Sequence, residues 1–235
     1  MSQQLDQIAS DAATKNWSFS QALESLIELE LESRNHNAIE RRFRLSRLQA
    51  RHTIDGFNFK HHKSRMEIKA RVARLLDLEF IDKGTSVVVI GNPGVGKTLL
   101  AKIVGWRACQ ANKRVLFTTA ADMLNQLNAS QIDHSLIRKL KLYTEPALLV
   151  IDELGYLALD QQTSNLFYQV ISARHSQKRS TIITTNTTFS DWGNVLHNST
   201  IAAAIADRLV ENSEIFLLGG ASVRNPQQHS NPPVE

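Results

Sequence analysis

Residues 87–98 read Val87-Val88-Val89-Ile90-Gly91-Asn92-Pro93-Gly94-Val95-Gly96-Lys97-Thr98, and this stretch decides the fold. The apolar run predicts a buried strand, a glycine-rich loop follows it, and residues 98–111 have the pattern of a helix. Glycines let successive backbone N–H groups surround a polyphosphate without Cβ clashes, and the helix N-terminus adds partial positive charge. The stretch is a complete P-loop (Walker A) motif, so the sequence predicts a nucleoside triphosphate site.

Two side chains of this motif have expected roles. Lys97 should reach the β- and γ-phosphates, and the Thr98 hydroxyl should ligate Mg²⁺. The alternative is a chance glycine-rich turn, which the strand before the loop and the helix after it disfavour. The residues expected to bind the nucleotide are Gly91, Asn92, Pro93, Gly94, Val95, Gly96, Lys97, Thr98 and Leu99.

Strands and helices alternate around the P-loop. Strands are expected at residues 86–90, 114–118, 147–151, 180–184 and 214–218. Helices are expected at residues 98–111, 120–142, 160–176 and 200–211. Apolar strands that alternate with amphipathic helices predict an α/β domain, over residues 81–220, with a parallel five-stranded sheet between helices.

A second motif follows the third expected strand, in Leu148-Leu149-Val150-Ile151-Asp152-Glu153. An apolar strand that ends in two carboxylates is the Walker B arrangement. Asp152 is expected to hold the Mg²⁺ shell, and Glu153 to orient and polarise the attacking water. An acidic pair after a strand is common by itself, but its place downstream of a P-loop favours an ATPase.

Two further polar residues are candidates for catalysis. Asn186, after the fourth expected strand, is placed to position the attacking water or sense the γ-phosphate; the alternative is an asparagine that only forms a turn. Arg208, near the end of the last helix, is expected to reach the nucleotide of a neighbouring subunit. Its alternative role is a surface ion pair with Asp207.

Composition sets further bounds on the chain. Its 235 residues, 42% of them hydrophobic, suffice for one core and a smaller appended unit. There is no apolar run long enough to span a membrane, and the first residues lack the form of a secretory signal. A single cysteine, Cys109, excludes an internal disulfide and a cysteine-based metal site. We therefore expect a cytoplasmic protein.

Positive charge is concentrated in one part of the chain. Residues 34–74 carry twelve Lys or Arg and three acidic residues, a net charge of +9, whereas residues 1–33 carry −5 and the rest is neutral. Such a patch attracts a polyanion through counterion release, so we expect contact with double-stranded DNA. An ordinary solvated helical surface is the alternative. The expected DNA-binding residues are Arg41, Arg42, Arg44, Arg47 and Arg51.

Residues 1–80 are expected to form a small helical domain for DNA binding and oligomerisation. Ser18 and Gln21 fit a capping box at the start of one helix, and a second helix is expected from residue 37 to about residue 50. On that second helix the arginines from Arg41 to Arg51 would share an arc of roughly 120°. A third helix is expected at residues 63–81, and residues 221–235, with three prolines, are expected to be disordered.

The blocks GNPGVGKT, LLVIDELGYLALD, TIITTN, FSDWGNVL and AAAIADRL together resemble the AAA+ family, in its initiator and helicase-loader branch. They are most similar to the IstB family of ATP-binding helpers of insertion-sequence transposition, and this likeness covers residues 20–224. It implies ATP and Mg²⁺ as ligands, an arginine finger at Arg208, a sensor-2-like arginine at Arg224, and no C-terminal lid. Residue 223 departs from the family, which has tyrosine where this chain has valine.

Three functions are candidates for a chain with these features. The favoured one is an ATP-switched, DNA-bound homo-oligomer that selects target DNA and recruits or stimulates a transposase. The second is a DnaC-type loader of a replicative helicase, built from the same ATPase. The third is a metabolic P-loop kinase, which leaves the basic patch and Arg208 unexplained.

Overall fold

The computed structural model describes residue 8 and residues 10–155, 159–196 and 198–223. Backbone contacts divide the chain into two compact units, Met1–Arg42 and Phe43–Glu235. This division comes earlier than the boundary expected near residue 80. The reason is that apolar side chains between residues 43 and 80, including Leu48, Phe57 and Val72, are buried in the larger unit.

The long helix α2 (Phe19–Ser46) extends over 28 residues. The expected capping box is present, since the Ser18 N–H donates to Gln21 Oε1 (2.8 Å) and the Gln21 N–H donates to Ser18 Oγ (3.3 Å). The second helix expected from residue 37 is a continuation of this one. No glycine or proline occurs between residues 19 and 46, so the sequence contains no strong helix breaker there.

Helix α2 ends at Ser46, four residues before the expected end. The Ser46 hydroxyl accepts a backbone N–H from two residues ahead (3.2 Å), and Arg47 has a φ of 60°. A left-handed residue directly after the last turn is a common way to end a helix. The expected arc of arginines is therefore wrong in part, because Arg41 and Arg44 lie on the helix but Arg47 and Arg51 lie beyond it.

Several short helices lead from α2 to the sheet. They are η1 (Ile54–Gly56), η2 (Phe59–His61), α3 (Lys63–Glu67), α4 (Lys69–Leu76) and α5 (Glu79–Asp82). The single helix expected at residues 63–81 is interrupted at Ile68 and at Leu78, whose φ is 65°. Its expected apolar side is confirmed, since Ile68, Val72 and Leu75 are all buried.

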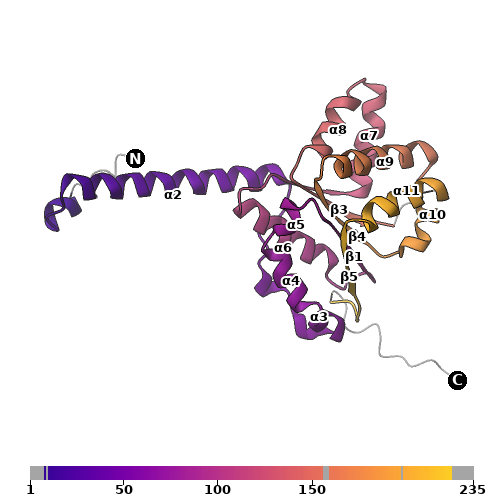
Figure 1. Ribbon diagram of the computed structural model, residues 1–235, viewed down its shortest axis with the longest axis horizontal. Coiled ribbons are helices and arrows are strands. Elements are labelled where there is room, and N and C mark those ends of the chain that lie inside the picture. Colours follow the sequence, from indigo (N-terminus) through magenta and orange to yellow (C-terminus); the bar gives the residue numbers. More distant parts are fainter. Residues whose placement is uncertain (1–7, 9, 156–158, 197, 224–235) are drawn as a thin grey trace. The chain divides into compact units, whose positions relative to one another are not determined.

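A parallel five-stranded sheet forms the centre of the larger unit (Figure 1). Its strands are β1 (Ser86–Gly91), β2 (Val115–Thr119), β3 (Leu148–Leu154), β4 (Ser180–Thr185) and β5 (Ser213–Leu218). Their order is β2-β3-β4-β1-β5, and every neighbouring pair is parallel. The five expected strands are confirmed, although β3 extends to Leu154, three residues further than expected. The carboxyl ends of all five strands meet at one edge.

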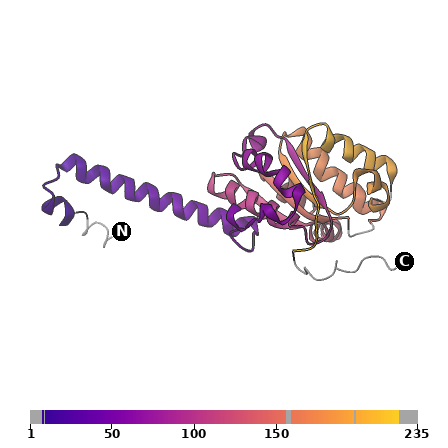
Figure 2. The same ribbon diagram turned by 90° about the horizontal axis from the view of Figure 1, so that it is seen from below.

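Helices cover both faces of this sheet, as the two views in Figure 1 and Figure 2 show. The helices from the P-loop onward are α6 (Lys97–Gln110), α7 (Ala120–Ile132), α8 (Leu136–Thr144), α9 (Gln161–Ser176), η3 (Phe189–Asp191), α10 (Trp192–Val195) and α11 (Ser199–Val210). The single helix expected at residues 120–142 is two helices, because His134 has a φ of 55° and Asp133 accepts hydrogen bonds from Ser135. No described helix is long and apolar enough to cross a bilayer.

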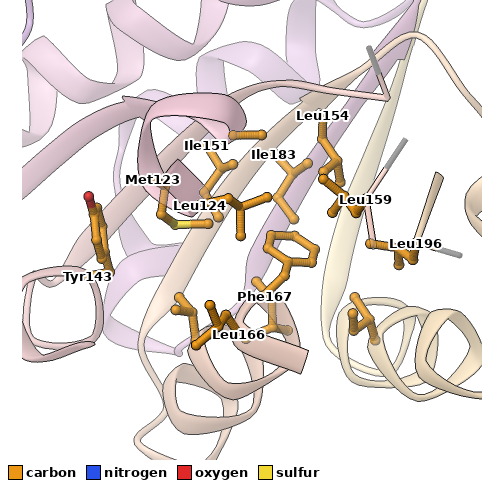
Figure 3. Close-up of a cluster of buried hydrophobic side chains, with 14 of the residues drawn as sticks. Met123, Leu124, Tyr143, Ile151, Leu154, Leu159, Leu166, Phe167, Ile183 and Leu196 are labelled. Carbon is orange, nitrogen blue, oxygen red and sulfur yellow. The ribbon is translucent and has the colours of Figure 1, made fainter. Parts of the chain in front are cut away.

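One apolar cluster packs α7, α9 and α11 against β3 and β4 (Figure 3). Met123, Ile151, Phe167 and Ile183 are buried side by side there, with Leu209 from α11 in the same cluster. Burial of apolar side chains of this size contributes about 1.5–3 kcal/mol each. The cluster therefore fixes the helices that follow the Walker B strand.

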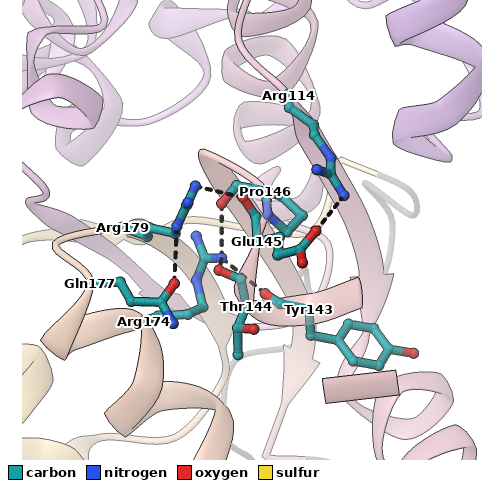
Figure 4. Close-up of polar contacts among 8 residues, drawn as sticks. All are labelled: Arg114, Tyr143, Thr144, Glu145, Pro146, Arg174, Gln177 and Arg179. Atoms are coloured by element: carbon teal, nitrogen blue, oxygen red, sulfur yellow. Dashed lines mark hydrogen bonds and ion pairs between the residues drawn. The ribbon is translucent and has the colours of Figure 1, made fainter. Parts of the chain in front are cut away.

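A buried arginine, Arg174, joins the segment before β3 to the start of β4, and Figure 4 shows its contacts with the segment before β3. Arg174 of α9 is 1% exposed and donates to the backbone carbonyls of Tyr143 (2.9 Å), Thr144 (3.3 Å), Pro146 (3.0 Å) and Ser180. Burial lowers the pKa of Arg174 to about 9, with a smaller effect in the same direction from the charge of Arg179. Its hydrogen bonds give it a structural role.

Candidate nucleotide-binding site

The P-loop connects the end of β1 to the start of α6, as the sequence predicted. Gly94 and Gly96 have φ values of 79° and 92°, in the left-handed region that favours glycine. A Cβ on Gly91 would lie 2.1 Å from the Leu218 carbonyl oxygen, so this position also requires glycine. The Lys97 ammonium donates to the carbonyls of Gly91 (2.7 Å) and Asn92 (2.9 Å), which holds it at the centre of the loop.

A cavity of about 260 Å³ opens beside the P-loop. Three parts of the chain line it together with the loop: the segment before β1, the ends of β3 and β4, and the segment after β5. The lining residues are Gly56, Asn58, Arg65, Pro93, Gly94, Gly96, Lys97, Thr98, Leu99, Glu153, Thr184 and Val223. The cavity thus brings Walker A residues and the Walker B glutamate to one place.

Thr98 and Asp152 meet at the floor of this site. The Thr98 hydroxyl donates to Asp152 Oδ1 at 3.0 Å, and the Asp152 side chain is buried. A hydroxyl and a carboxylate are the hard oxygen ligands that Mg²⁺ prefers, usually together with waters and substrate phosphates. The donor set therefore fits the magnesium site that the sequence predicted.

The backbone directs the side chains of Glu153 and Asp152 to different places. Glu153 has a φ of 64°, and the pairing of β3 with β4 shifts between Ile151 and Leu154. A bulge of this kind re-aims a side chain, and bulges are frequent beside active sites. The carboxylate of Glu153 is exposed and lines the cavity, whereas that of Asp152 is buried next to Thr98.

Thr184 of β4 is part of the site, and sequence reasoning missed it. Its side chain is fully buried, accepts the Glu153 N–H at 3.0 Å and donates to Asp152 Oδ1. The only signal in the sequence is a polar residue two places before Asn186. Threonine is also a common strand residue, so this signal is weak.

Asn186 lies beside the end of β3, close to the site but outside the cavity lining. Its Oδ1 is buried and has no hydrogen-bond partner in the part of the chain that the structure describes. A Cβ on Gly155, whose φ is 110°, would lie 2.6 Å from that oxygen. The glycine therefore permits the close approach of Asn186 to the loop that follows Glu153.

Arg65, counted with the basic patch in the sequence, contacts the P-loop. It is 2% exposed, and its Nη2 donates to the Val95 carbonyl at 2.5 Å while its Nη1 donates to the Asn58 carbonyl at 3.0 Å. The guanidinium also lies 4.7 Å from the centroid of the Phe57 ring. Burial lowers the pKa of Arg65 from its ordinary value.

The segment after β5 also lies on the P-loop. The Val223 N–H donates to the Gly94 carbonyl at 3.0 Å, and His61 Nε2 donates to the Ala221 carbonyl at 2.9 Å. Residues 221–223 were expected to belong to a disordered tail, but these hydrogen bonds fix them at the mouth of the cavity. Arg224, the expected sensor-2-like arginine, lies outside the described residues.

Arg208 lies far from the P-loop of its own chain. It borders a hollow lined by Ser86 and Thr181, which are at the starts of β1 and β4, whereas the P-loop follows the end of β1. The amino-terminal and carboxyl-terminal ends of β1 are roughly 17 Å apart, at 3.3 Å per residue. The guanidinium lies 4.9 Å from the Tyr168 ring centroid, and within the described ranges no ion pair joins it to Asp207.

The expected DNA-binding arginines fall in both compact units. Arg41 and Arg42 belong to the first unit, and Arg44, Arg47 and Arg51 belong to the second. All except Arg42 are exposed. Arg51 lies 4.9 Å from the Phe43 ring and 5.5 Å from the Trp106 ring, so aromatic side chains restrict its orientation.

Known proteins resemble this chain over almost its full length. The family model of the IstB-like ATP-binding proteins matches residues 1–231. A protein named for ATP binding in insertion sequence IS5376 of Geobacillus stearothermophilus is 37% identical over 224 residues, which cover 95% of this chain and 88% of the relative. Its counterpart in insertion sequence IS21 of Pseudomonas aeruginosa is 31% identical, over 95% of this chain and 83% of the relative.

Solved structures show the same AAA+ fold as this chain. The DnaC helicase loader matches with a TM-score of 0.60 and 21% identity, over 74% of this chain and 96% of that chain. AMPPCP-bound DnaA from Aquifex aeolicus matches with a TM-score of 0.61 and 16% identity, over 73% of this chain and 51% of that chain. The whole-length family match and the identity to its members show that this chain belongs to the IstB-like ATP-binding proteins.

Proposed function

We propose that this protein is a Mg²⁺-dependent ATPase that uses ATP to control its assembly on double-stranded DNA during transposition. The observation that carries the proposal is the arrangement around one cavity of Lys97, the hydrogen-bonded Thr98–Asp152 pair, and Glu153. A P-loop is sufficient for nucleotide binding. The exposed glutamate beside it is the additional group that hydrolysis requires.

The chain's own residues would carry out the steps of ATP hydrolysis. The P-loop N–H groups and Lys97 bind the phosphates. Thr98 and Asp152 would hold Mg²⁺, which would neutralise charge on the transferred phosphoryl group. Glu153 accepts a hydrogen bond from a water and orients its oxygen toward the γ-phosphorus. The water oxygen bonds to the γ-phosphorus while the bond from that phosphorus to the β–γ bridging oxygen breaks, and one water proton passes through Glu153 to the released phosphate. The products are ADP and inorganic phosphate.

A neighbouring subunit completes this site in our proposal. Arg208 is at the opposite edge of the sheet from its own P-loop, so it serves a nucleotide bound by the next subunit of a homo-oligomer. An arginine supplied in this way neutralises charge in the transition state. ATP between subunits would stabilise their contact by mass action, and hydrolysis would release it.

Double-stranded DNA is the proposed polyanionic partner. The net charge of +9 on residues 34–74 and the exposed guanidinium groups of Arg41, Arg44, Arg47 and Arg51 support it. The relatives are named for insertion sequences, which supports a transposase as the protein partner. A second candidate is loading of a replicative helicase, which the likeness to the DnaC helicase loader favours.

A combined ATPase and DNA assay tests the proposal. Purified protein is given ATP and Mg²⁺ with and without duplex DNA, and phosphate release and assembly on the DNA are measured together. We expect DNA to stimulate hydrolysis, and ATP to increase assembly. Addition of either the transposase of its own insertion sequence or a replicative helicase then separates the two candidates, since only the true partner should bind the ATP-loaded assembly.

A further inference from the structure

One threonine hydroxyl contacts both Walker B residues. Thr184 of β4 accepts the backbone N–H of Glu153 at 3.0 Å and donates to Oδ1 of Asp152. The side chain is fully buried. Because a hydroxyl has a single proton, the bond to Asp152 uses it, and the lone pairs remain free to accept from Glu153.

The position of Thr184 coincides with the bulge in β3. Ile151 pairs with Ile183 and Leu154 pairs with Thr185, so Asp152 and Glu153 together lie opposite Thr184 alone. The extra residue of a bulge is left without its ladder hydrogen bond. Here the Thr184 hydroxyl supplies a partner for the Glu153 N–H in place of a backbone carbonyl.

This arrangement gives the two carboxylates different environments. Asp152 Oδ1 accepts from Thr98 at 3.0 Å and from Thr184, so its carboxylate is held in the buried floor of the site. Glu153, with a φ of 64°, is turned toward the cavity. A non-glycine residue in the left-handed region costs free energy and persists only where its surroundings fix it.

We propose that Thr184 is a positioning residue for ATP hydrolysis: its hydroxyl fixes the bulge that directs Asp152 to the metal side and Glu153 to the attacking water. This inference rests on the proposed ATPase function and deepens it. A hydroxyl is required for the role, and the methyl group of threonine only fills space in β4. Serine should therefore replace Thr184, whereas valine, which has the same shape, should not.

The test compares Thr184→Val and Thr184→Ser in the full chain with the wild type. Thr118→Val is a matched control, since Thr118 is also a buried strand threonine next to β3, but its hydroxyl donates to the Thr119 carbonyl and not to Asp152 or Glu153. Loss of a group that orients a metal ligand typically reduces metal affinity or activity about 10–100-fold. We expect a fall of that size in kcat and a higher Mg²⁺ requirement for Thr184→Val, with ATP affinity in the absence of Mg²⁺ unchanged.

Hydrogen exchange provides a readout that does not depend on hydrolysis. The amide of Glu153 should exchange faster in Thr184→Val than in the wild type, and Thr184→Ser should restore both slow exchange and activity. The inference would be overturned if Thr184→Val had the kcat, the Mg²⁺ dependence and the Glu153 amide exchange rate of the wild type. It would also be overturned if Thr184→Val lost ATP affinity in the absence of Mg²⁺ by the same factor as it lost activity. If the wild type hydrolyses no ATP, the proposed function fails, and Glu153 exchange together with Mg²⁺ binding still decides the role of Thr184.

Discussion

The guanidinium of Arg65 donates from Nη2 to the carbonyl oxygen of Val95 at 2.5 Å, so a residue upstream of the sheet holds the middle of the P-loop. The same guanidinium packs on Phe57 and would contact a Cβ placed on Gly96 at 2.8 Å. Arg65 Nε is buried without a hydrogen-bond partner among the described residues. The P-loop is therefore fixed by a buried cation as well as by its own backbone.

Replacement of Arg65 with methionine should loosen the P-loop. The buried Val95 carbonyl and the partly buried Asn58 carbonyl would lose their donor, and leaving a buried acceptor unsatisfied costs about 1–3 kcal/mol in free energy of unfolding. ATP affinity should fall as well, because the loop N–H groups are then less well ordered. Chemical denaturation and nucleotide titration measure the two effects, and Arg74→Met, at an exposed position on α4, is the control. Unchanged stability and affinity would contradict the structural role of the Arg65–Val95 bond.

Lys97→Ala and Glu153→Gln should separate nucleotide binding from hydrolysis. Lys97→Ala removes the ammonium at the centre of the loop, so ATP affinity should fall. Glu153→Gln keeps the shape of the side chain and leaves Thr98 and Asp152 intact, so ATP and Mg²⁺ should still bind while hydrolysis slows about 10²–10⁴-fold. Fluorescent nucleotide titration and phosphate release measure the two steps. Hydrolysis by Glu153→Gln at the wild-type rate would show that the Walker B assignment is wrong.

Alanine at Arg41, Arg44 and Arg47 should weaken DNA binding about equally for all sequences, because phosphate contacts carry no base information. The slope of log affinity against log salt should also decrease, by up to about 2.7 for three lost phosphate contacts. Replacement of three cations on α8, the exposed Arg138 and Lys141 and the partly buried Lys139, is the charge-matched control. An equal effect of both triple variants would indicate a general charge effect and would contradict a defined DNA-binding surface.

Local patterns predicted much of the fold. The five strands, the P-loop and the Walker B pair follow from apolar runs and short motifs, which are local in sequence. The end of α2 was missed because the Ser46 hydroxyl bonds to the backbone there, an interaction that helical periodicity does not reveal. Arg65 and Thr184 were missed because their contacts join segments about 30 residues apart in sequence. In the sequence, Arg65 is a basic residue within a basic run, and Thr184 is an ordinary strand threonine.

Arg208→Ala should bind ATP like the wild type, since this arginine lies at the opposite edge of the sheet from its own P-loop. Its rate of ATP hydrolysis should fall roughly 10³-fold or more, which is the usual contribution of an arginine supplied by a neighbouring subunit. ATP-dependent assembly on DNA should weaken as well. Because the guanidinium also packs on Tyr168, thermal unfolding of Arg208→Ala and Arg208→Lys must be compared first, to separate local packing from catalysis.

Mixing Arg208→Ala with Lys97→Ala tests whether Arg208 acts between subunits. Each variant lacks one half of a composite site, the first its arginine and the second its P-loop lysine. An active site can form only where an intact Lys97 from one subunit meets an intact Arg208 from another, so mixing should recover part of the activity. The wild-type rate per subunit should also rise with protein concentration, since sites between subunits require assembly. A rate per subunit that is independent of concentration, with no recovery on mixing, would limit Arg208 to packing on Tyr168 within its own subunit.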